Sequence, residues 1–251
     1  MNSLGNGNVK FDKHMIRKAI GMADFRKAVI IGAGGGIGNA LAEAIEARGG
    51  SVRRLGRNRD PRIDFLDPDT IPAAADALRD AAPFDTVIIA SGILHGEDFG
   101  PEKSAAMLDA DVLRRVMAIN AIGPALVARH FLPLLPRAKR FHFAALSARV
   151  GSISDNRLGG WYSYRMSKAA LNQFVRTFSI ELARTHKQGV VTALHPGTVD
   201  TGLSAPFQSN VPDGQLFAPD RSANALLDVL ADLEPTDSGG HFDYAGDRVP
   251  A

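Results

Sequence analysis

Three side chains near the middle of the chain have the types needed to move a proton at a carbonyl oxygen: Ser147, Tyr164 and Lys168. Tyr164 and Lys168 are four residues apart, so on a helix both side chains point to the same face. An unperturbed phenol has a pKa of about 10, too high for easy proton exchange near neutral pH. An ammonium group one helical turn away favours the phenolate and makes the tyrosine a usable general acid and base. A serine hydroxyl at the preceding strand end could hold a substrate carbonyl.

Because Y-x-x-x-K is common by chance on helices, its meaning depends on the glycine-rich turn that precedes it. GAGGGIG at 32–38 directly follows an apolar run at 27–31 and leads into a helix pattern. Gly32, Gly36 and Gly38, with Ile37 between the last two, give a G-x-x-x-G-x-G spacing. Such a turn lets the backbone approach a pyrophosphate at a helix N-terminus. It could also be an ordinary strand–helix junction, but its place at the start of an α/β pattern predicts a dinucleotide cofactor.

The end of the second predicted strand indicates which dinucleotide binds. An acidic residue there suits the ribose hydroxyls of NAD, and an arginine suits the 2′-phosphate of NADP. The sequence SVRRLGRNRD places Arg57 at this point and has no acidic residue before Asp60. We therefore predict NADP, with NAD as the alternative if the arginines are solvated surface charges. Asp64 could accept a hydrogen bond from the adenine amino group, or could cap a turn.

Strands and helices that alternate along the chain must position these residues. They predict an α/β fold: one Rossmann-type doubly wound parallel sheet of about seven strands, with helices on both faces. The predicted strands lie at 27–31, 51–56, 62–64, 84–91, 140–147, 189–197 and 239–244. The predicted helices lie at 38–50, 71–82, 109–135, 162–185 and 222–233. Residues 22–251 are expected to form a single domain, and the polar residues 1–21 a loosely ordered extension.

The composition excludes several classes of function. There are 29 basic and 27 acidic residues, a net charge of +2 without a basic run, so no nucleic-acid partner is expected. No apolar stretch approaches the roughly 20 residues of a membrane span. The absence of cysteine excludes thiolate chemistry, and the seven histidines lack metal-ligand spacing, so no metal site is expected. These features predict a cytoplasmic protein.

From about Lys27 to its end the chain resembles the short-chain dehydrogenase/reductase family. The resemblance rests on five segments: GAGGGIG, Asn120 within MAINAIGPAL, Ser147, YRMSK with Tyr164 and Lys168, and HPGTVDT at 195–201. GGWYSYRMSKAALN and LHPGTVDTGLS also resemble the C-factor (C-signal) subgroup of that family. The family's dimers and tetramers imply a homodimer or homotetramer here.

The resemblance also implies a role for each matching residue. Tyr164 would exchange the proton, Lys168 would lower its pKa and hold the nicotinamide ribose, and Asn120 would support a proton relay through water. The remaining cofactor contacts would come from Gly92 at the adenine ribose, from Pro196, Gly197 and Val199 near the nicotinamide, and from Thr201 at its carboxamide or at the phosphates.

Two segments depart from the family pattern. IASG at 89–92 stands where the family usually has Asn-Asn-Ala-Gly. Ser147 is farther from Tyr164 than usual, and alignment on Gly151 puts the usual serine position on Ala148. Either Ser147 enters the site through a shifted strand end, or Ser152 replaces it, or the serine role is weakened. We expect Ser147, which requires a bulge because strand side chains alternate faces.

Together these features predict an NADP-dependent oxidoreductase that interconverts a carbonyl and a secondary alcohol in a small molecule. Residues 202–219 are expected to form a partly apolar lid over the substrate. The alternative is a nucleotide-binding signalling or regulatory protein of C-factor type with little turnover.

Overall fold

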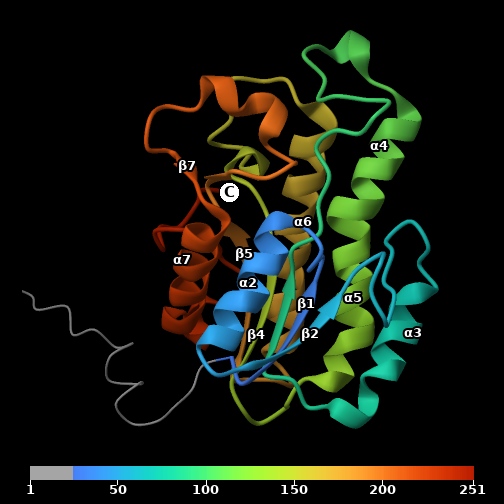
Figure 1. Ribbon diagram of the computed structural model, residues 1–251, viewed down its shortest axis with the longest axis vertical. Coiled ribbons are helices and arrows are strands. Elements are labelled where there is room, and N and C mark those ends of the chain that lie inside the picture. The colour runs from blue at the N-terminus through green and yellow to red at the C-terminus, as the bar shows by residue number, and fades with distance from the viewer. Residues whose placement is uncertain (1–24) are drawn as a thin grey trace, which may run out of the picture.

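Short apolar runs form one parallel sheet in the computed structural model, which describes residues 25–251 (Figure 1). In order of pairing the strands are β2 (Ser51–Leu55), β1 (Lys27–Ile31), β3 (Thr86–Ile89), β4 (Phe141–Leu146), β5 (Gly189–His195) and β8 (His241–Asp243). All of these pairings are parallel. The predicted α/β doubly wound class is confirmed, with six strands in the sheet rather than about seven. The extension predicted for residues 1–21 lies outside the described residues.

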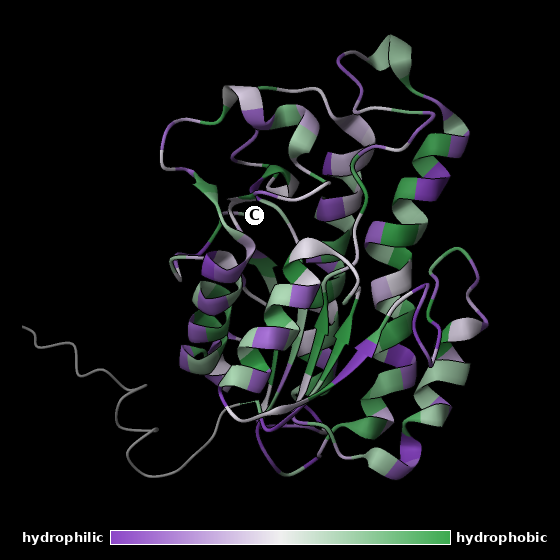
Figure 2. Ribbon diagram, viewed as in Figure 1, coloured by the Kyte–Doolittle hydropathy of each residue, from purple (hydrophilic) through white to green (hydrophobic). Residues whose placement is uncertain are grey.

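Helices cover both faces of this sheet because alternate strand residues are apolar on both sides. In β1, Val29 and Ile31 belong to the core beneath α3, α5 and α6, whereas Ala28 and Ile30 belong to the core beneath α2 and α7. The helices are α2 (Gly36–Ala47), α3 (Thr70–Ala77), α4 (Ala110–Met117), α5 (Gly123–Phe131), α6 (Tyr162–Leu182) and α7 (Pro219–Asp232). Figure 2 shows the resulting pattern, with hydrophobic residues concentrated in the central strands and hydrophobic and polar residues alternating along the helices.

The strand order reverses between β1 and β3. From β1 the chain passes through α2 to β2 on one side, then crosses back to β3 on the other. In open α/β sheets a ligand binds at the carboxyl ends of the strands where the order reverses. Here those ends lead into Gly32 and Gly92, which the sequence had singled out.

The prediction of a short strand at residues 62–64 was wrong. This segment makes isolated bridges, Gly56 with Arg62 and Asp64 with Asp67. The Arg62 guanidinium binds the carboxylates of both Asp64 and Asp67, at 3.0 and 2.9 Å. These ion pairs fold the segment into a compact turn, so the sheet ends at β2.

The long helix predicted at 109–135 is interrupted by a π-helical segment, η3 (Ala118–Ile122), between α4 and α5. Such segments are frequent at functional sites, and this one contains Asn120. By length and composition the run Ala110–Leu134 is apolar enough to cross a membrane, but 44% of its apolar stretch is buried inside the fold. Val127 and Phe131 of α5 pack in the core against the sheet.

The expected lid, residues 202–219, contains the 3-10 helix η6 (Ala205–Asn210) and strand β7 (Leu216–Phe217). β7 pairs with β6 (Thr198–Val199) in a small separate sheet. In Figure 1 this segment lies over the same end of the central sheet as the first turns of α2 and α6. The glycine turn, the tyrosine helix and the lid thus meet at one end of the molecule.

Candidate active site

The first turns of α6 bring Tyr164 and Lys168 into the interior. Tyr164 is 8% exposed and Lys168 is 3% exposed, and the lysine Nζ lies 5.6 Å from the centroid of the tyrosine ring. Lys168 Nζ donates a hydrogen bond to the Leu146 carbonyl oxygen at 2.8 Å. The predicted i, i+4 pair therefore shares one face of a helix, anchored to the end of β4.

Burial sets the protonation of both groups in this arrangement. Burial raises the pKa of Tyr164, and burial lowers the pKa of Lys168 to about 8. The sequence-based expectation was that the ammonium would lower the pKa of Tyr164. The structure places the two groups together, but the loss of water outweighs their attraction. Tyr164 is therefore a protonated phenol near neutral pH, suited to donating a proton.

Asn120 connects the segment after β3 to α6. It is fully buried, and its side chain both accepts a hydrogen bond from Ile93 N and donates one to Ile93 O, each at 2.8 Å. Its amide also donates to Ser167 Oγ at 3.0 Å. A Cβ added at Gly92 would lie 3.6 Å from Asn120 Oδ1 and from Lys168 Nζ. The structure thus brings Gly92, Asn120 and Lys168 together.

Ser147 faces away from this group. Its hydroxyl donates to Asn172 Oδ1 at 2.7 Å, whereas Ala148, the next residue, packs with Tyr164 and Leu94. β4 ends at Leu146 and the chain continues extended through Ala148, so the alternation of faces puts the alanine beside Tyr164. The bulge that would have turned Ser147 towards the tyrosine does not form, and this geometry does not support the expected role of Ser147.

Ser152 does not replace it. Its side chain is turned towards the end of the chain, where its hydroxyl lies 3.4 Å from the Ala251 carbonyl oxygen and accepts a hydrogen bond from Asp155 N at 3.1 Å. Of the three possibilities left open by the sequence, the structure favours a site whose wall next to Tyr164 lacks a serine hydroxyl.

The entrance to α6 is built from left-handed backbone. Gly159, Gly160 and Trp161 have φ values of 65°, 64° and 52°, and a tryptophan rarely adopts this conformation. Trp161 N donates to the Glu102 carbonyl oxygen at 2.5 Å. The Glu102 carboxylate, 3% exposed, accepts from Ser163 N at 3.2 Å and from the Ser163 hydroxyl. Glu102 therefore caps α6 from another part of the chain.

The glycine turn is tightly packed against its neighbours. A Cβ at Gly32 (φ 88°) would lie 2.6 Å from Ser91 N, and a Cβ at Gly38 would lie 2.2 Å from the Gly32 carbonyl oxygen. A Cβ at Gly36 would lie 2.6 Å from Thr201 Cγ2, so Thr201 contacts the turn directly. Ile37 is half-buried and packs against the core beneath α2 and α7. At Gly32 and Gly38 only glycine fits without moving the backbone, whereas a Cβ at Gly36 would displace the Thr201 side chain.

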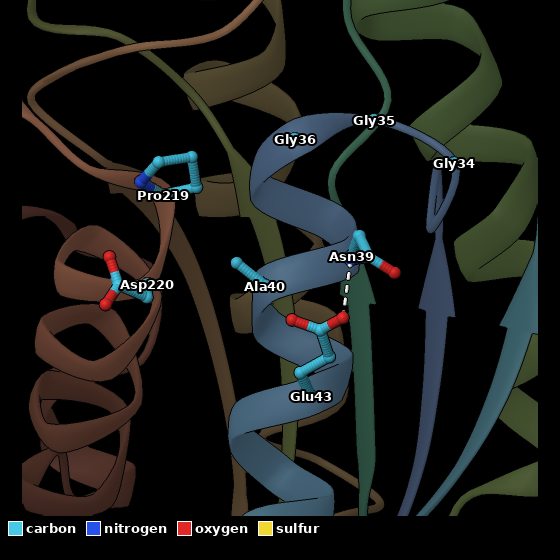
Figure 3. A pocket seen from close by; sticks show the side chains of 8 residues that line it. All are labelled: Gly34, Gly35, Gly36, Asn39, Ala40, Glu43, Pro219 and Asp220. Atoms are coloured by element: carbon cyan, nitrogen blue, oxygen red, sulfur yellow. Dashed lines mark hydrogen bonds between the residues drawn. The ribbon is translucent and has the colours of Figure 1, made fainter.

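The turn opens onto a hollow that fits a phosphate group at its rim. Next to the first turn of α2 is a space of about 460 Å³, which reaches across to the start of α7 (Figure 3). No atom lies within 4 Å of the Cβ position of Gly34, and the start of α2 has neither a side-chain cap nor an acidic residue in its first turn. The first N–H groups are therefore free to bind an anion. Glu43 and Asp220 line the hollow farther from the turn.

Arg57 and Asp64, which were predicted to contact the adenine side of the cofactor, differ in whether they are free to bind a ligand. Arg57 is exposed just after β2, and within residues 25–251 it makes no ion pair, whereas Arg54 is held by Glu46 and Arg62 by Asp64. Asp64 Oδ1 also accepts from Leu66 N at 3.0 Å. Asp64 thus serves as the turn cap that the sequence left open, and Arg57 remains available.

The segment after β5 is fixed by close packing. Gly197 has φ 78°, and a Cβ there would lie 2.9 Å from the Phe217 ring. Val199 is buried, and the Pro196 carbonyl oxygen accepts a hydrogen bond from the Ser222 hydroxyl at 2.8 Å. This segment leads to Thr201 beside the glycine turn, which favours the phosphate side of the contacts expected for that threonine.

The sequence did not indicate Glu102, and it led us to expect Ser147 rather than Ala148 next to Tyr164. Glu102 lies 61 residues before Ser163, and no local pattern links them. One signal existed: GGW before α6 provides no side-chain cap, so a partner from elsewhere was needed. For Ala148, the alignment on Gly151 already pointed to it.

The comparisons with known proteins identify the family of this chain. The family model for short chain dehydrogenases matches residues 26–212, and the chain therefore belongs to the short-chain dehydrogenase family of oxidoreductases. The C-signal protein of Myxococcus xanthus is 42% identical over 139 residues, which cover 55% of this chain and 78% of that protein.

Two further matches extend over most of the chain. The 1-hydroxy-2-glutathionyl-2-methyl-3-butene dehydrogenase of Rhodococcus sp. (strain AD45) is 30% identical over 224 residues, 84% of this chain and 93% of that enzyme. A short-chain dehydrogenase/reductase from Burkholderia multivorans with bound NADP has a TM-score of 0.75 at 26% identity, covering 91% of this chain and all of that one.

Proposed function

We propose that the protein transfers a hydride between NADP(H) and the carbonyl or secondary alcohol group of a small molecule. The observation that carries the proposal is the buried Tyr164–Lys168 pair, set against Asn120 and Gly92 at the end of the sheet where the glycine turn lies. Hydride chemistry is what a nicotinamide supplies when bound. The residues of the chain bind, orient and move the proton.

In the direction of reduction Tyr164 donates its phenolic proton to the carbonyl oxygen as that oxygen gains negative charge. The Lys168 ammonium stabilises the phenolate that remains, because the site is dry and the charge attraction is weakly screened. Asn120 holds Ile93 and Ser167 in place through both ends of its amide. In oxidation the same groups act in reverse.

NADP is favoured over NAD by the unpaired Arg57 at the end of β2. A guanidinium group can bind a phosphate with two parallel hydrogen bonds, and among residues 25–251 no carboxylate pairs with Arg57. The relative from Burkholderia multivorans binds NADP, which supports the same choice.

Tyr164→Phe tests the proposal. Removing the proton donor is expected to lower kcat by about 10²–10⁴-fold, because general acid catalysis has this size. A fluorescence titration with NADPH should give the same affinity for the variant and for the wild type. Turnover that survives the substitution would contradict the assignment of Tyr164.

A second candidate is a regulatory protein that binds the nucleotide with little turnover. It is favoured by the similarity to C-signal and by Ala148 beside Tyr164, where no serine hydroxyl can hold a substrate oxygen. The two candidates differ in one result: a biological role that survives Tyr164→Phe supports the regulator, and one lost together with turnover supports the enzyme.

A further inference from the structure

Three ring side chains, Trp161, Phe207 and His95, form a series of ring contacts that begins at Tyr164, and we call them the aromatic wall. The Trp161 and Phe207 ring centroids are 5.2 Å apart at 54°, and those of Trp161 and Tyr164 are 6.3 Å apart at 72°. His95 meets Phe207 edge-on at 5.8 Å. The wall joins the start of α6, the lid and the segment after β3.

The rest of this cluster is apolar. Leu94 and Ala148 are buried against Tyr164, and Val150 and Leu203 pack around them. His95 Nε2 is already engaged with the Gly202 carbonyl oxygen at 3.1 Å. The Tyr164 hydroxyl, His95 Nδ1 and the Trp161 indole N–H are therefore the few polar groups that this cluster offers to a substrate.

The backbone holds the wall in a costly conformation. Trp161 keeps φ at 52°, and Glu102 fixes it through the Trp161 N–H. Left-handed non-glycine residues are uncommon and gather at functional sites, where the surrounding structure enforces them. A glycine would adopt this backbone conformation more easily, so the presence of tryptophan at this position indicates a role for its indole ring.

We propose that the substrate is an aryl ketone or aldehyde whose ring packs on Trp161 and Phe207 while its carbonyl oxygen meets Tyr164. This inference rests on the proposed oxidoreductase function and names its substrate class. Flat rings gain from offset or edge-on contacts with the wall. A polyhydroxylated substrate would bury hydroxyl groups without partners, which apolar sites reject strongly.

The test compares three ketones with NADPH as reductant: acetophenone, cyclohexyl methyl ketone and dihydroxyacetone. Wild-type protein is expected to reduce acetophenone with a kcat/KM at least about 100-fold above that for dihydroxyacetone. Trp161→Gly, which accepts the left-handed backbone, should lower kcat/KM for acetophenone about tenfold and largely remove its advantage over the cyclohexyl ketone. Phe207→Leu should act in the same direction, and Leu158→Ala, at a 92% exposed residue, should change neither value.

A binding measurement gives a readout that does not depend on turnover. Trp161 is the only tryptophan in the chain, so its emission reports on the wall alone. In Tyr164→Phe, which is expected to bind without turnover, 1-phenylethanol added with NADP⁺ should change this emission, and glycerol should leave it unchanged.

The outcomes separate the two proposals. If NADPH does not bind in the fluorescence titration, the oxidoreductase function itself fails; if NADPH binds and acetophenone is not reduced, the aryl substrate class is overturned. If dihydroxyacetone is reduced as well as acetophenone, or if Trp161→Gly keeps the preference for the aryl ketone, the function stands and the aryl substrate class is overturned. Emission that is unchanged by 1-phenylethanol would also overturn it.

Discussion

At the scale of single residues, the directions in which the side chains of Ser147 and Ala148 point after β4 decide which residue lies next to Tyr164. Ser147 turns to Asn172 and Ala148 turns to the tyrosine. Both residue types could be read from the sequence, and so could the unusual spacing. Which of them enters the site depended on a bulge of one residue. The alignment on Gly151 pointed to Ala148, but no local pattern showed whether the bulge forms.

Ala148→Ser is therefore expected to raise kcat for a ketone by about tenfold, since a hydrogen bond to an oxygen that gains charge is worth more than one between neutral groups. Steady-state kinetics with NADPH would measure it. Ser147→Ala is the matched change on the other face. It should lower the free energy of unfolding by about 1 kcal/mol through the lost bond to Asn172, with kcat close to wild type. Loss of turnover in Ser147→Ala would show that this serine acts in the reaction after all.

Arg57 carries the choice of nucleotide at the same scale. Arg57→Ala is expected to weaken NADPH binding by about tenfold or more while NADH binding stays the same, because the side chain would contact only the 2′-phosphate. Fluorescence titrations with both nucleotides would show this. Arg54→Ala is the matched control, since Arg54 is already paired with Glu46 at 2.6 Å. Equal losses for NADPH and NADH would mean that Arg57 does not bind the phosphate.

At the scale of elements, the pattern of apolar runs predicted most strands and helices within a few residues. The strands of the central sheet other than the edge strand β2 are buried on both faces, and each helix has one apolar face. The short strand at 62–64 failed because its charged residues pair with one another. Local sequence patterns also could not predict hydrogen bonds between segments that are far apart in the chain. The bond from Glu102 to the start of α6 is the main example.

Glu102 should act as a positioning residue for that helix. Glu102→Ala removes the acceptor of two Ser163 donors, so we expect about 1–3 kcal/mol less stability and a reduced kcat. Glu102→Gln keeps one acceptor oxygen and should restore much of both. The readout specific to positioning is the pH dependence of kcat, which should shift in Glu102→Ala because Tyr164 sits in the first turn. A stability loss with an unchanged pH profile would leave Glu102 a purely structural role.

At the scale of the whole molecule, the site has a cost in stability at Lys168. Its pKa is about 8 in the fold and near 10.5 in an unfolded chain. Below pH 8 both states are protonated and the folded state bears the full cost of a buried charge. Between pH 8 and 10.5 the unfolded chain binds more protons, so stability rises with pH as this cost disappears.

Lys168→Met is therefore expected to be more stable than the wild type at pH 7, by up to about 3 kcal/mol, although it loses the bond to Leu146 O. The difference should shrink as the pH rises towards 10.5. Urea unfolding at pH 7 and at pH 10 would test both statements. Lys139→Met, at an exposed residue, should show no such pH dependence. A variant less stable than wild type at pH 7 would show that the buried ammonium stabilises the folded state overall.

The left-handed residues 159–161 have a consequence for how this chain can vary. They reverse the hand of the backbone immediately before α6, and Glu102 fixes where the right-handed turns begin. An α-helix advances about 100° per residue, so one residue inserted or deleted here would rotate Tyr164 and Lys168 together out of the site. The exposed loop just before, with Ile153 and Leu158 at 79% and 92% exposure, has no such constraint on its side chains. We therefore expect the number of residues between that loop and α6 to tolerate change less than their composition, because any insertion or deletion there would change the rotational position of the helix.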